Sequence, residues 1–285
     1  MTEIACKVHR IPNINGSNAV LISDKKMALV DTGVAGNSEA IISYIKDIGR
    51  KPEDLAWIVV THFHYDHSGS ADELAKLTGA KIVAHLDETI EASGGRRFLL
   101  KGNENTGSGP PWWYKAFFGN RRDRQNRKEK TQLEKFDYID TEIHQAVHDG
   151  DVIPVLGGLR ILHTPGHTPG SICPVLEGRR MIFLGDSVLN NRIRLSRPLT
   201  WDKRKRKQLD ISLRSLRNEQ LDHACFGHGP PLMDEADTGI KALTDRPYNV
   251  PTWRIALKHR ATLKRFRERS KGPGHWEGGI DSDQK

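Results

Sequence analysis

The sequence predicts a mixed α/β fold in which two β-sheets lie face to face between helices. Two observations indicate this class. Short apolar segments with strand character alternate with segments whose apolar residues recur at helical spacing. The order of strands, then a helix, then a strand occurs in the first 90 residues and again after residue 150. Each half therefore supplies a sheet with an apolar face, and packing the two sheets together buries both faces.

The first half contains short apolar runs that predict strands at 18–22, 27–31, 57–61 and 81–85. The first two strands flank the turn residues SDKK and form a predicted hairpin. Helices are predicted at 39–49, where isoleucines at helical spacing stop at Gly49, and at 70–79. In the second helix, Leu74 and Leu77 are expected to face the core.

The second half contains further apolar runs that predict strands at 152–156, 159–163, 171–177, 180–186 and 223–227. A helix rich in arginine and lysine is predicted between the last two of these strands, at about 203–218. Its leucines at 209, 213 and 216 recur at i, i+4 and i+7, which predicts an apolar inner face.

Two segments differ from this body in composition. An insertion at about 95–147 is rich in aromatic and basic residues, including Trp112 and Trp113. It is either a helix packed on the body, a lid over a substrate cleft, or a membrane-interface segment. Residues 246–285 are predicted to form a basic C-terminal helix and a flexible tail, which leaves 1–245, including the insertion, as the main domain.

The net charge of +8 is concentrated in basic segments at 121–130, 202–207 and 254–271. Together they carry more positive charge than the whole chain, so the remainder is net negative. Such segments can bind nucleic acid or an anionic membrane surface, although a solvated lysine-rich surface is the simpler interpretation. A homodimer is also compatible with the sequence.

The cysteines and the apolar residues indicate a soluble, cytoplasmic protein. Cys6, Cys173 and Cys225 stand far apart without a C-x-x-C pair, which suits a reducing compartment. No run of about 18 apolar residues is long enough to span a bilayer. The first residues also lack the apolar core of a signal peptide.

The stretch THFHYDHSG, residues 61–69, follows a predicted strand and is dense in metal-ligand side chains. His62 and His64, two positions apart at a strand end, point to the same side. The turn into the next helix brings Asp66 and His67 to the same space. Imidazole and carboxylate together suit zinc or a similar metal. Because a catalytic zinc needs about three protein ligands, four candidates suggest more than one metal.

Three later loops repeat this arrangement of an apolar strand followed by a ligand-type residue. His167 lies in HTPGHTPGS, Asp186 in LGDS and His228 in FGHGPP. His85, His163 and His223 are expected to be structural instead. Each loop alone is weak evidence, but the four together in this order predict one metal centre at the sheet edge.

The motifs H-x-H-x-D-H, TPGHTPG, GDS and GHG resemble those of the metallo-β-lactamase-fold hydrolase superfamily, over nearly the whole span from 18 to 232. The resemblance implies an αββα four-layer sandwich with a dinuclear site at one edge of the paired sheets. The first metal is then expected at His62, His64 and His167, the second at Asp66, His67 and His228, with Asp186 bridging both.

The resemblance also assigns supporting and catalytic roles. Asp31 in LVDTG matches the family's early aspartate, which supports the metal loop. Asp66 and Asp186 are the expected catalytic carboxylates. Tyr65, Trp112 and Trp113 are candidates for lining a substrate pocket. True β-lactamases of this fold generally lack the bridging aspartate, so a lactamase is disfavoured.

Two divalent cations lower the pKa of a shared water to about 7 and polarise the bond to be cleaved. The expected activity is therefore hydrolysis of a small-molecule ester, lactone or thioester by a metal-bridged hydroxide. The alternative is a ribonuclease Z-like nuclease or phosphodiesterase that binds nucleic acid through the basic segments. A metal-stabilised binding module without activity is the third hypothesis. Zinc is the expected metal, and the ligand types also admit manganese or iron.

Overall fold

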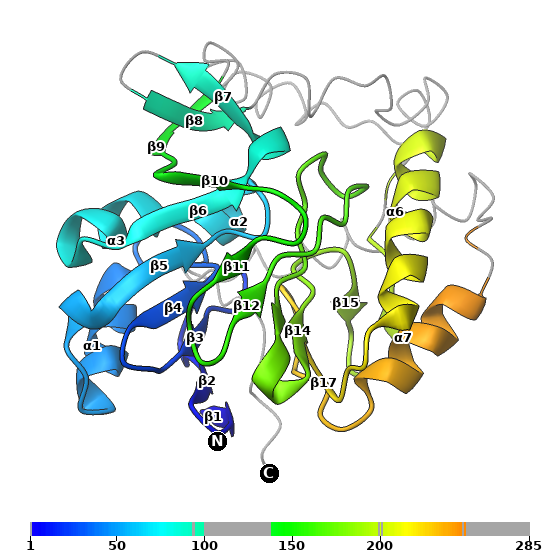
Figure 1. The fold of residues 1–285 in the computed structure, drawn as a ribbon, viewed down its shortest axis with the longest axis horizontal. Helices are drawn as coiled ribbons and strands as arrows, with labels where there is room; N and C mark the ends of the chain where they lie inside the picture. The colour runs from blue at the N-terminus through cyan, green and yellow to red at the C-terminus, as the bar shows by residue number, and fades with distance from the viewer. Residues whose placement is uncertain are drawn as a thin grey trace, which may run out of the picture.

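The computed structural model describes residues 2–92, 95–99, 138–198, 200, 202–246 and 248. Two β-sheets pack face to face, and helices cover their outer faces (Figure 1). The predicted αββα sandwich is confirmed. No helix in these ranges is long and apolar enough to cross a membrane.

The first sheet has seven strands in the order β1-β2-β3-β4-β5-β6-β10. They span Glu3–Ala5, Val8–Arg10, Val20–Ile22, Met27–Val30, Leu55–Val59, Lys81–His85 and Gln145–Val147. Strands β1 to β4 pair antiparallel, whereas β4, β5, β6 and β10 pair parallel. Parallel strands end at the same edge of a sheet, so the segments after β5, β6 and β10 meet there.

The second sheet has five strands in the order β11-β12-β13-β14-β17. They span Val152–Ile153, Leu159–Arg160, Val175–Leu176, Met181–Phe183 and His223–Cys225. Only the β14 and β17 pair is parallel among these neighbours. The GDS loop after β14 and the GHG loop after β17 therefore leave the sheet side by side.

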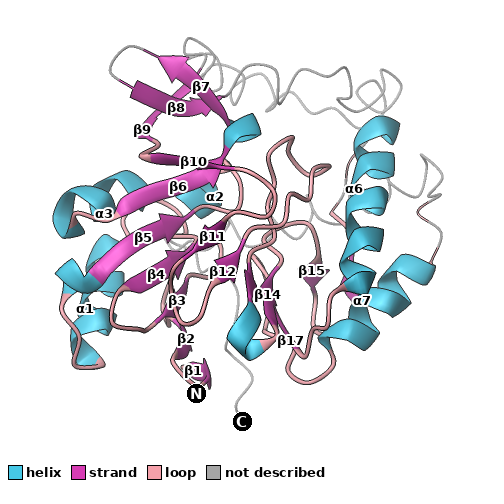
Figure 2. Ribbon diagram, in the orientation of Figure 1, coloured by secondary structure: helices cyan, strands magenta, loops and turns pink. Residues whose placement is uncertain are grey.

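Alternation along the strands divides the core into three layers. In β4, Leu29 packs in the outer cluster with helices α1 (Ser38–Asp47) and α3 (Ala71–Thr78), whereas Val30 packs between the sheets. Phe183 of β14 also lies between the sheets, and its neighbour Ile182 faces the opposite side. There it packs with α6 (Lys203–Ser215) and α7 (Ala236–Asp245). Figure 2 shows these helix pairs on the two outer sides of the strands.

The predicted apolar face of the arginine- and lysine-rich segment is confirmed, because Leu209 and Leu213 of α6 and Leu216, which directly follows it, are all buried. The prediction for α3 was wrong in one residue. Leu74 is buried, but the side chain of Leu77 is 55% exposed. Ala71, Leu74, Ala75 and Thr78 already form the buried stripe of this short helix, and Leu77 lies on its other side.

Smaller elements lie beside the main sheets. Strands β7 (Thr89–Ala92), β8 (Gly95–Leu99) and β9 (Tyr138–Glu142) form a three-stranded sheet that follows the 3₁₀ turn η2 (Leu86–Glu88). β15 (Leu189–Asn190) and β16 (Leu195–Ser196) form a hairpin. The insertion expected at 95–147 is thus described only at its ends, and β10 within it belongs to the first sheet.

Candidate metal centre

Three histidines from two loops face one another at the sheet edge. The loop after β5 carries His62 and His64, and the TPGHTPG loop carries His167. The Nε2 atoms of His62 and His167 each lie 3.0 Å from Nδ1 of His64. Three imidazole nitrogens that point toward one shared space have the arrangement of ligands around a bound cation. The structure thus brings together the three residues expected at the first metal.

A second group lies next to the first. The single-turn helix α2 (Tyr65–Ser68) carries Asp66 and His67, and the loop after β17 carries His228. Nε2 of His228 lies 3.1 Å from Oδ2 of Asp66. One ligand atom from each of the three residues lies within 4.8 Å of the others. These are the residues expected at the second metal.

Asp186 lies between the two groups. Its Oδ1 atom is 3.4 Å from Nε2 of His67 and 3.6 Å from Nε2 of His228. Its Oδ2 atom is 3.8 Å from Nε2 of His167. The two oxygens of one carboxylate therefore face different histidine groups, which is the arrangement that a bridging ligand requires.

Unsatisfied polar atoms in the centre fit a bound cation. Within the described ranges, the buried atoms Nε2 of His67 and Oδ1 of Asp186 have no hydrogen-bond partner. Leaving such an atom unpaired costs about 1–3 kcal/mol, and a divalent cation would satisfy both. The GHG loop approaches so closely that a Cβ atom on Gly227 would lie 2.5 Å from Asp186 Oδ1. The donor set and its tight enclosure therefore fit divalent metals.

The charges of the centre also favour cations. Burial lowers the pKa of His62 well below its usual value and that of His167 to about 3, so both imidazoles are neutral and can donate lone pairs. Burial alone would lower the pKa of His67, but Asp31 and Asp186 raise it well above the usual value. The same carboxylates that attract a proton to His67 attract a metal ion.

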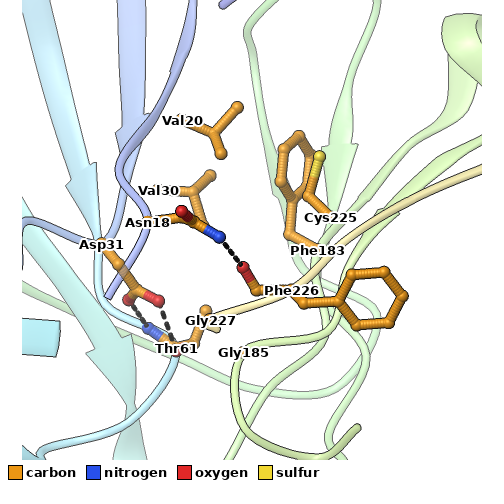
Figure 3. Close-up of a pocket in the computed structure, with 10 residues that line it drawn as sticks. All are labelled: Asn18, Val20, Val30, Asp31, Thr61, Phe183, Gly185, Cys225, Phe226 and Gly227. Atoms are coloured by element: carbon orange, nitrogen blue, oxygen red, sulfur yellow. Dashed lines mark hydrogen bonds between the residues drawn. The ribbon is translucent and has the colours of Figure 1, made fainter. Parts of the chain in front are cut away.

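Asp31 and Thr61, which lie between the two sheets, orient the rings of His62 and His67. Asp31 Oδ1 accepts a hydrogen bond from the Thr61 amide, and Oδ2 accepts one from the Thr61 hydroxyl, both at 2.8 Å (Figure 3). Nδ1 of His67 donates to the same Oδ2 at 2.8 Å. Because the Thr61 hydroxyl donates to Asp31, it can accept from Nδ1 of His62 at 3.2 Å. Both rings then direct Nε2 into the centre.

Asp31 holds this position with an uncommon backbone conformation. Its φ angle of 57° lies in the left-handed region, and its side chain is buried. Backbone strain of this kind persists where surrounding contacts fix it and is concentrated at functional sites.

The centre opens to solvent on the side of the second group. The side chains of Asp66 and His228 are 40% and 39% exposed, whereas His67 is fully buried. Tyr65, which precedes Asp66, is 61% exposed. A substrate can therefore reach the centre beside Tyr65. The other expected pocket residues, Trp112 and Trp113, lie outside the described residues.

A further group of ligand-type side chains, His85, Asp87 and His163, lies nearby. The two imidazoles stack at 3.8 Å with an angle of 13° between their planes, so their ring edges do not converge on one point. The His85 Nδ1 atom accepts the Asp87 amide, and His163 Nε2 donates to the Pro169 carbonyl. Both histidines serve the packing of the loops.

One buried carboxylate at the centre was not predicted. Glu88 is fully buried and bonds to loops that carry the first histidine group. The sequence AHLDE contains no periodicity or motif that distinguishes this glutamate from a surface residue. Its role depends on contacts that only the folded chain creates.

Comparison with known proteins identifies the family. The family model of the metallo-beta-lactamase superfamily matches residues 13–267. The chain therefore belongs to the metallo-β-lactamase superfamily, and it is a metal-dependent hydrolase of that superfamily.

Individual relatives match parts of the chain. Protein YobT of Bacillus subtilis is 29% identical over 187 residues, which are 65% of this chain and 67% of that protein. The exodeoxyribonuclease WalJ of Streptococcus pneumoniae is 35% identical over 102 residues, or 35% of this chain and 37% of WalJ. A metal-dependent hydrolase of Pyrococcus abyssi is 43% identical over 75 residues, or 25% and 30% of the two chains. The alignments thus cover only about a third of these last two relatives.

Solved structures support the fold. A metallo-β-lactamase family protein from Thermus thermophilus superimposes with a TM-score of 0.58 at 20% identity, covering 95% of this chain and 85% of that one. At this identity the likeness shows the fold alone.

Proposed function

We propose that this chain is a dinuclear hydrolase that cleaves a small ester, lactone or thioester. The observation that carries the proposal is the position of Asp186, whose two oxygens face the two ligand groups. A bridging carboxylate offsets the repulsion between two cations held close together. One group alone would suffice for a structural metal.

In this proposal each group would hold one divalent ion, and Asp186 would contribute to both. His62, His64 and His167 would hold the first, and Asp66, His67 and His228 would hold the second. Such a pair of ions would activate water and polarise the bond to be cleaved. Nitrogen and oxygen donors without sulfur suit zinc, with manganese or iron as alternatives.

The chain's own residues orient this chemistry. Asp31 holds the ring of His67, and Asp66 and His228 form the exposed side that meets the substrate. The Asp66 side chain lies at that opening, and its oxygen that is not used as a metal ligand can accept a proton from an incoming water or return one to the leaving group. The exposed ring of Tyr65 supplies an apolar contact for a small substrate.

Removal of the metals tests whether hydrolysis depends on bound metal. Incubation with a chelator, followed by dialysis, is expected to abolish hydrolysis while the fold remains. Adding back zinc, manganese or iron(II) singly and measuring turnover then shows which ion restores it. Undiminished turnover in protein that metal analysis shows to be free of metal would exclude a metal-dependent reaction.

Tyr65 provides a test of the substrate side. Tyr65→Ala is expected to raise KM about fivefold to tenfold for substrates with an apolar acyl group, because one exposed aromatic contact is worth about 1 kcal/mol. Metal content and kcat are expected to change little. The control is Leu77→Ala, which removes an exposed apolar side chain from α3. Equal KM values for wild type and Tyr65→Ala across all substrates would contradict a substrate contact.

A nuclease is the second candidate, and two observations favour it. WalJ, which shares 35% identity over part of the chain, is an exodeoxyribonuclease. The first turn of α6 is basic, although cations at a helix N-terminus oppose the helix dipole. Burial lowers the pKa of His167 most and Asp186 opposes this, while Lys205 in this turn adds a smaller lowering, which places its positive charge near the centre. Positive charge beside the centre suits a phosphodiester.

A panel of substrates separates the two candidates. Purified protein of known metal content is tested on a p-nitrophenyl ester, a lactone, a thioester, bis-p-nitrophenyl phosphate and single-stranded RNA and DNA. Turnover of acyl substrates, insensitive to salt, is expected. Turnover of the phosphodiesters alone, falling steeply with salt, would overturn the acyl proposal in favour of a nuclease.

A further inference from the structure

Glu88 is a buried acidic residue next to the centre. It ends the turn η2, directly after β6, and its exposed fraction is 0%. Glutamate is almost never fully buried without partners, because the removal of its charge from water is costly. Its partners therefore indicate why it is there.

The Glu88 carboxylate joins two loops. Its Oε2 atom accepts a hydrogen bond from the Phe63 amide at 3.1 Å, and Phe63 lies between His62 and His64. Its Oε1 atom accepts the Gly170 amide at 2.7 Å and the Thr168 hydroxyl. Both accepting oxygens are thus engaged, one with each loop of the first histidine group.

Burial and hydrogen bonding act in opposite directions on the ionisation of Glu88. Burial raises the pKa of its carboxyl to about 7, and the hydrogen bonds from Thr168, Phe63 and Gly170 oppose the rise. Two backbone amides and one hydroxyl need acceptor oxygens, so the carboxylate is the form that holds both loops.

The fit around Glu88 is tight. A Cβ atom on Gly170 would lie 2.6 Å from Glu88 Cγ, so only glycine allows this approach. The Thr168 amide donates to the Ser171 hydroxyl at 3.0 Å, which closes the turn on itself. The carboxylate therefore fixes the distance between two rigid segments.

The second ligand group has a different support. His67 bonds to Asp31, and His228 bonds to Asp66. In the described part of the chain, the hydrogen bonds of Glu88 go to neither of these histidines. Asp31 bonds directly to His67 of the second group and reaches His62 of the first group only through Thr61, whereas Glu88 bonds only to the loops of the first group.

We propose that Glu88 is the positioning residue of the first metal: its carboxylate holds the two loops at the spacing where His62, His64 and His167 converge. This inference rests on the dinuclear site proposed above. Groups that orient metal ligands typically contribute about 10-fold to 100-fold to metal affinity.

The test is Glu88→Gln, which keeps the size of the side chain. One oxygen becomes an NH2 group, which must face either the Phe63 amide or the donors of the His167 loop. One loop thereby loses its anchor. Titration with cobalt(II) is expected to show first-site affinity lowered about 10-fold to 100-fold, with an altered visible absorption spectrum, while second-site affinity changes less than threefold.

The matched control is Glu73→Gln, which makes the same change at a glutamate that accepts a bond from Ser38 on the helix side of the first sheet. Both cobalt affinities are expected to remain at the wild-type values. If Glu88→Gln lowered the cobalt affinity equally at both sites, selective positioning of the first metal would be contradicted. Wild-type cobalt affinities and an unchanged absorption spectrum in Glu88→Gln would contradict it as well.

A second variant decides the question if Glu88→Gln does not fold. Thr168→Val removes one donor to Glu88 and keeps the side-chain shape, so a loss of about threefold to tenfold at the first site is expected. An unchanged first site in that variant would overturn the inference. Wild-type protein that binds fewer than two cobalt ions would contradict the dinuclear proposal itself, and the inference about Glu88 with it.

Discussion

Asp186→Ala is expected to reduce kcat/KM at least about 1,000-fold and to reduce bound metal below two ions per chain. The carboxylate is proposed to bind both cations, so its removal weakens both sites and restores the repulsion between them. A 1,000-fold loss corresponds to about 4 kcal/mol of transition-state stabilisation. Metal analysis and steady-state kinetics on the same preparation measure both effects.

Asp72→Ala serves as the control for this change. Asp72 forms an exposed ion pair with Lys76 on α3, and such pairs contribute about 0–1 kcal/mol. Its activity and metal content are expected to equal those of wild type. Asp186→Asn adds a second comparison, because it keeps the shape of the side chain and removes the charge. Full metal content and turnover in Asp186→Ala would refute the bridging assignment.

Asp31→Asn is expected to lower kcat/KM about 100-fold and to weaken the second metal more than the first, because Asp31 bonds directly to His67 and reaches His62 only through Thr61. Asparagine tolerates the left-handed conformation of this residue about as well as aspartate does, so the substitution adds no backbone strain. The charge that attracts the Nδ1 proton of His67 is lost, and the ring can rotate or change tautomer. Loss of a partner of this type typically lowers metal affinity about 10-fold to 100-fold.

The selectivity of Asp31→Asn is opposite to that of Glu88→Gln, which makes the two variants controls for each other. Cobalt titration is expected to show that Asp31→Asn weakens mainly the second metal site. Glu88→Gln is expected to weaken mainly the first metal site. Asp31→Ala adds the strain of the left-handed backbone and is expected to lower the thermal unfolding temperature further than Asp31→Asn. Identical metal-binding curves for Asp31→Asn and Glu88→Gln would contradict separate supports.

The ligand cluster could be predicted because its signal is local. H-x-H-x-D-H places ligand-type residues at a strand end, and His167, Asp186 and His228 each follow an apolar run. Helix α6 was predictable for the same reason, since its leucines repeat at helical spacing. The short strands β1 (EIA) and β2 (VHR) lack the continuous apolar run that revealed β3 (VLI), which is equally short.

Features that depend on long-range packing could not be predicted. Leu77 fits an apolar helix pattern, yet the sheet covers only the side of α3 that carries Leu74. Glu88 becomes a partner of Phe63 and Gly170 only when two distant loops meet. Asp31, in its left-handed conformation, likewise meets Thr61 and His67 only in the folded chain. The expected binding of nucleic acid or an anionic membrane surface by the basic segments stays a prediction, and so does the homodimer.

The most direct test of a dinuclear centre is anomalous X-ray diffraction from crystals of zinc-loaded protein, recorded on both sides of the zinc absorption edge. Two anomalous peaks are expected, one among His62, His64 and His167 and the other among Asp66, His67 and His228. Both should lie within bonding distance of Asp186. A single peak, or peaks away from Asp186, would contradict the proposed centre.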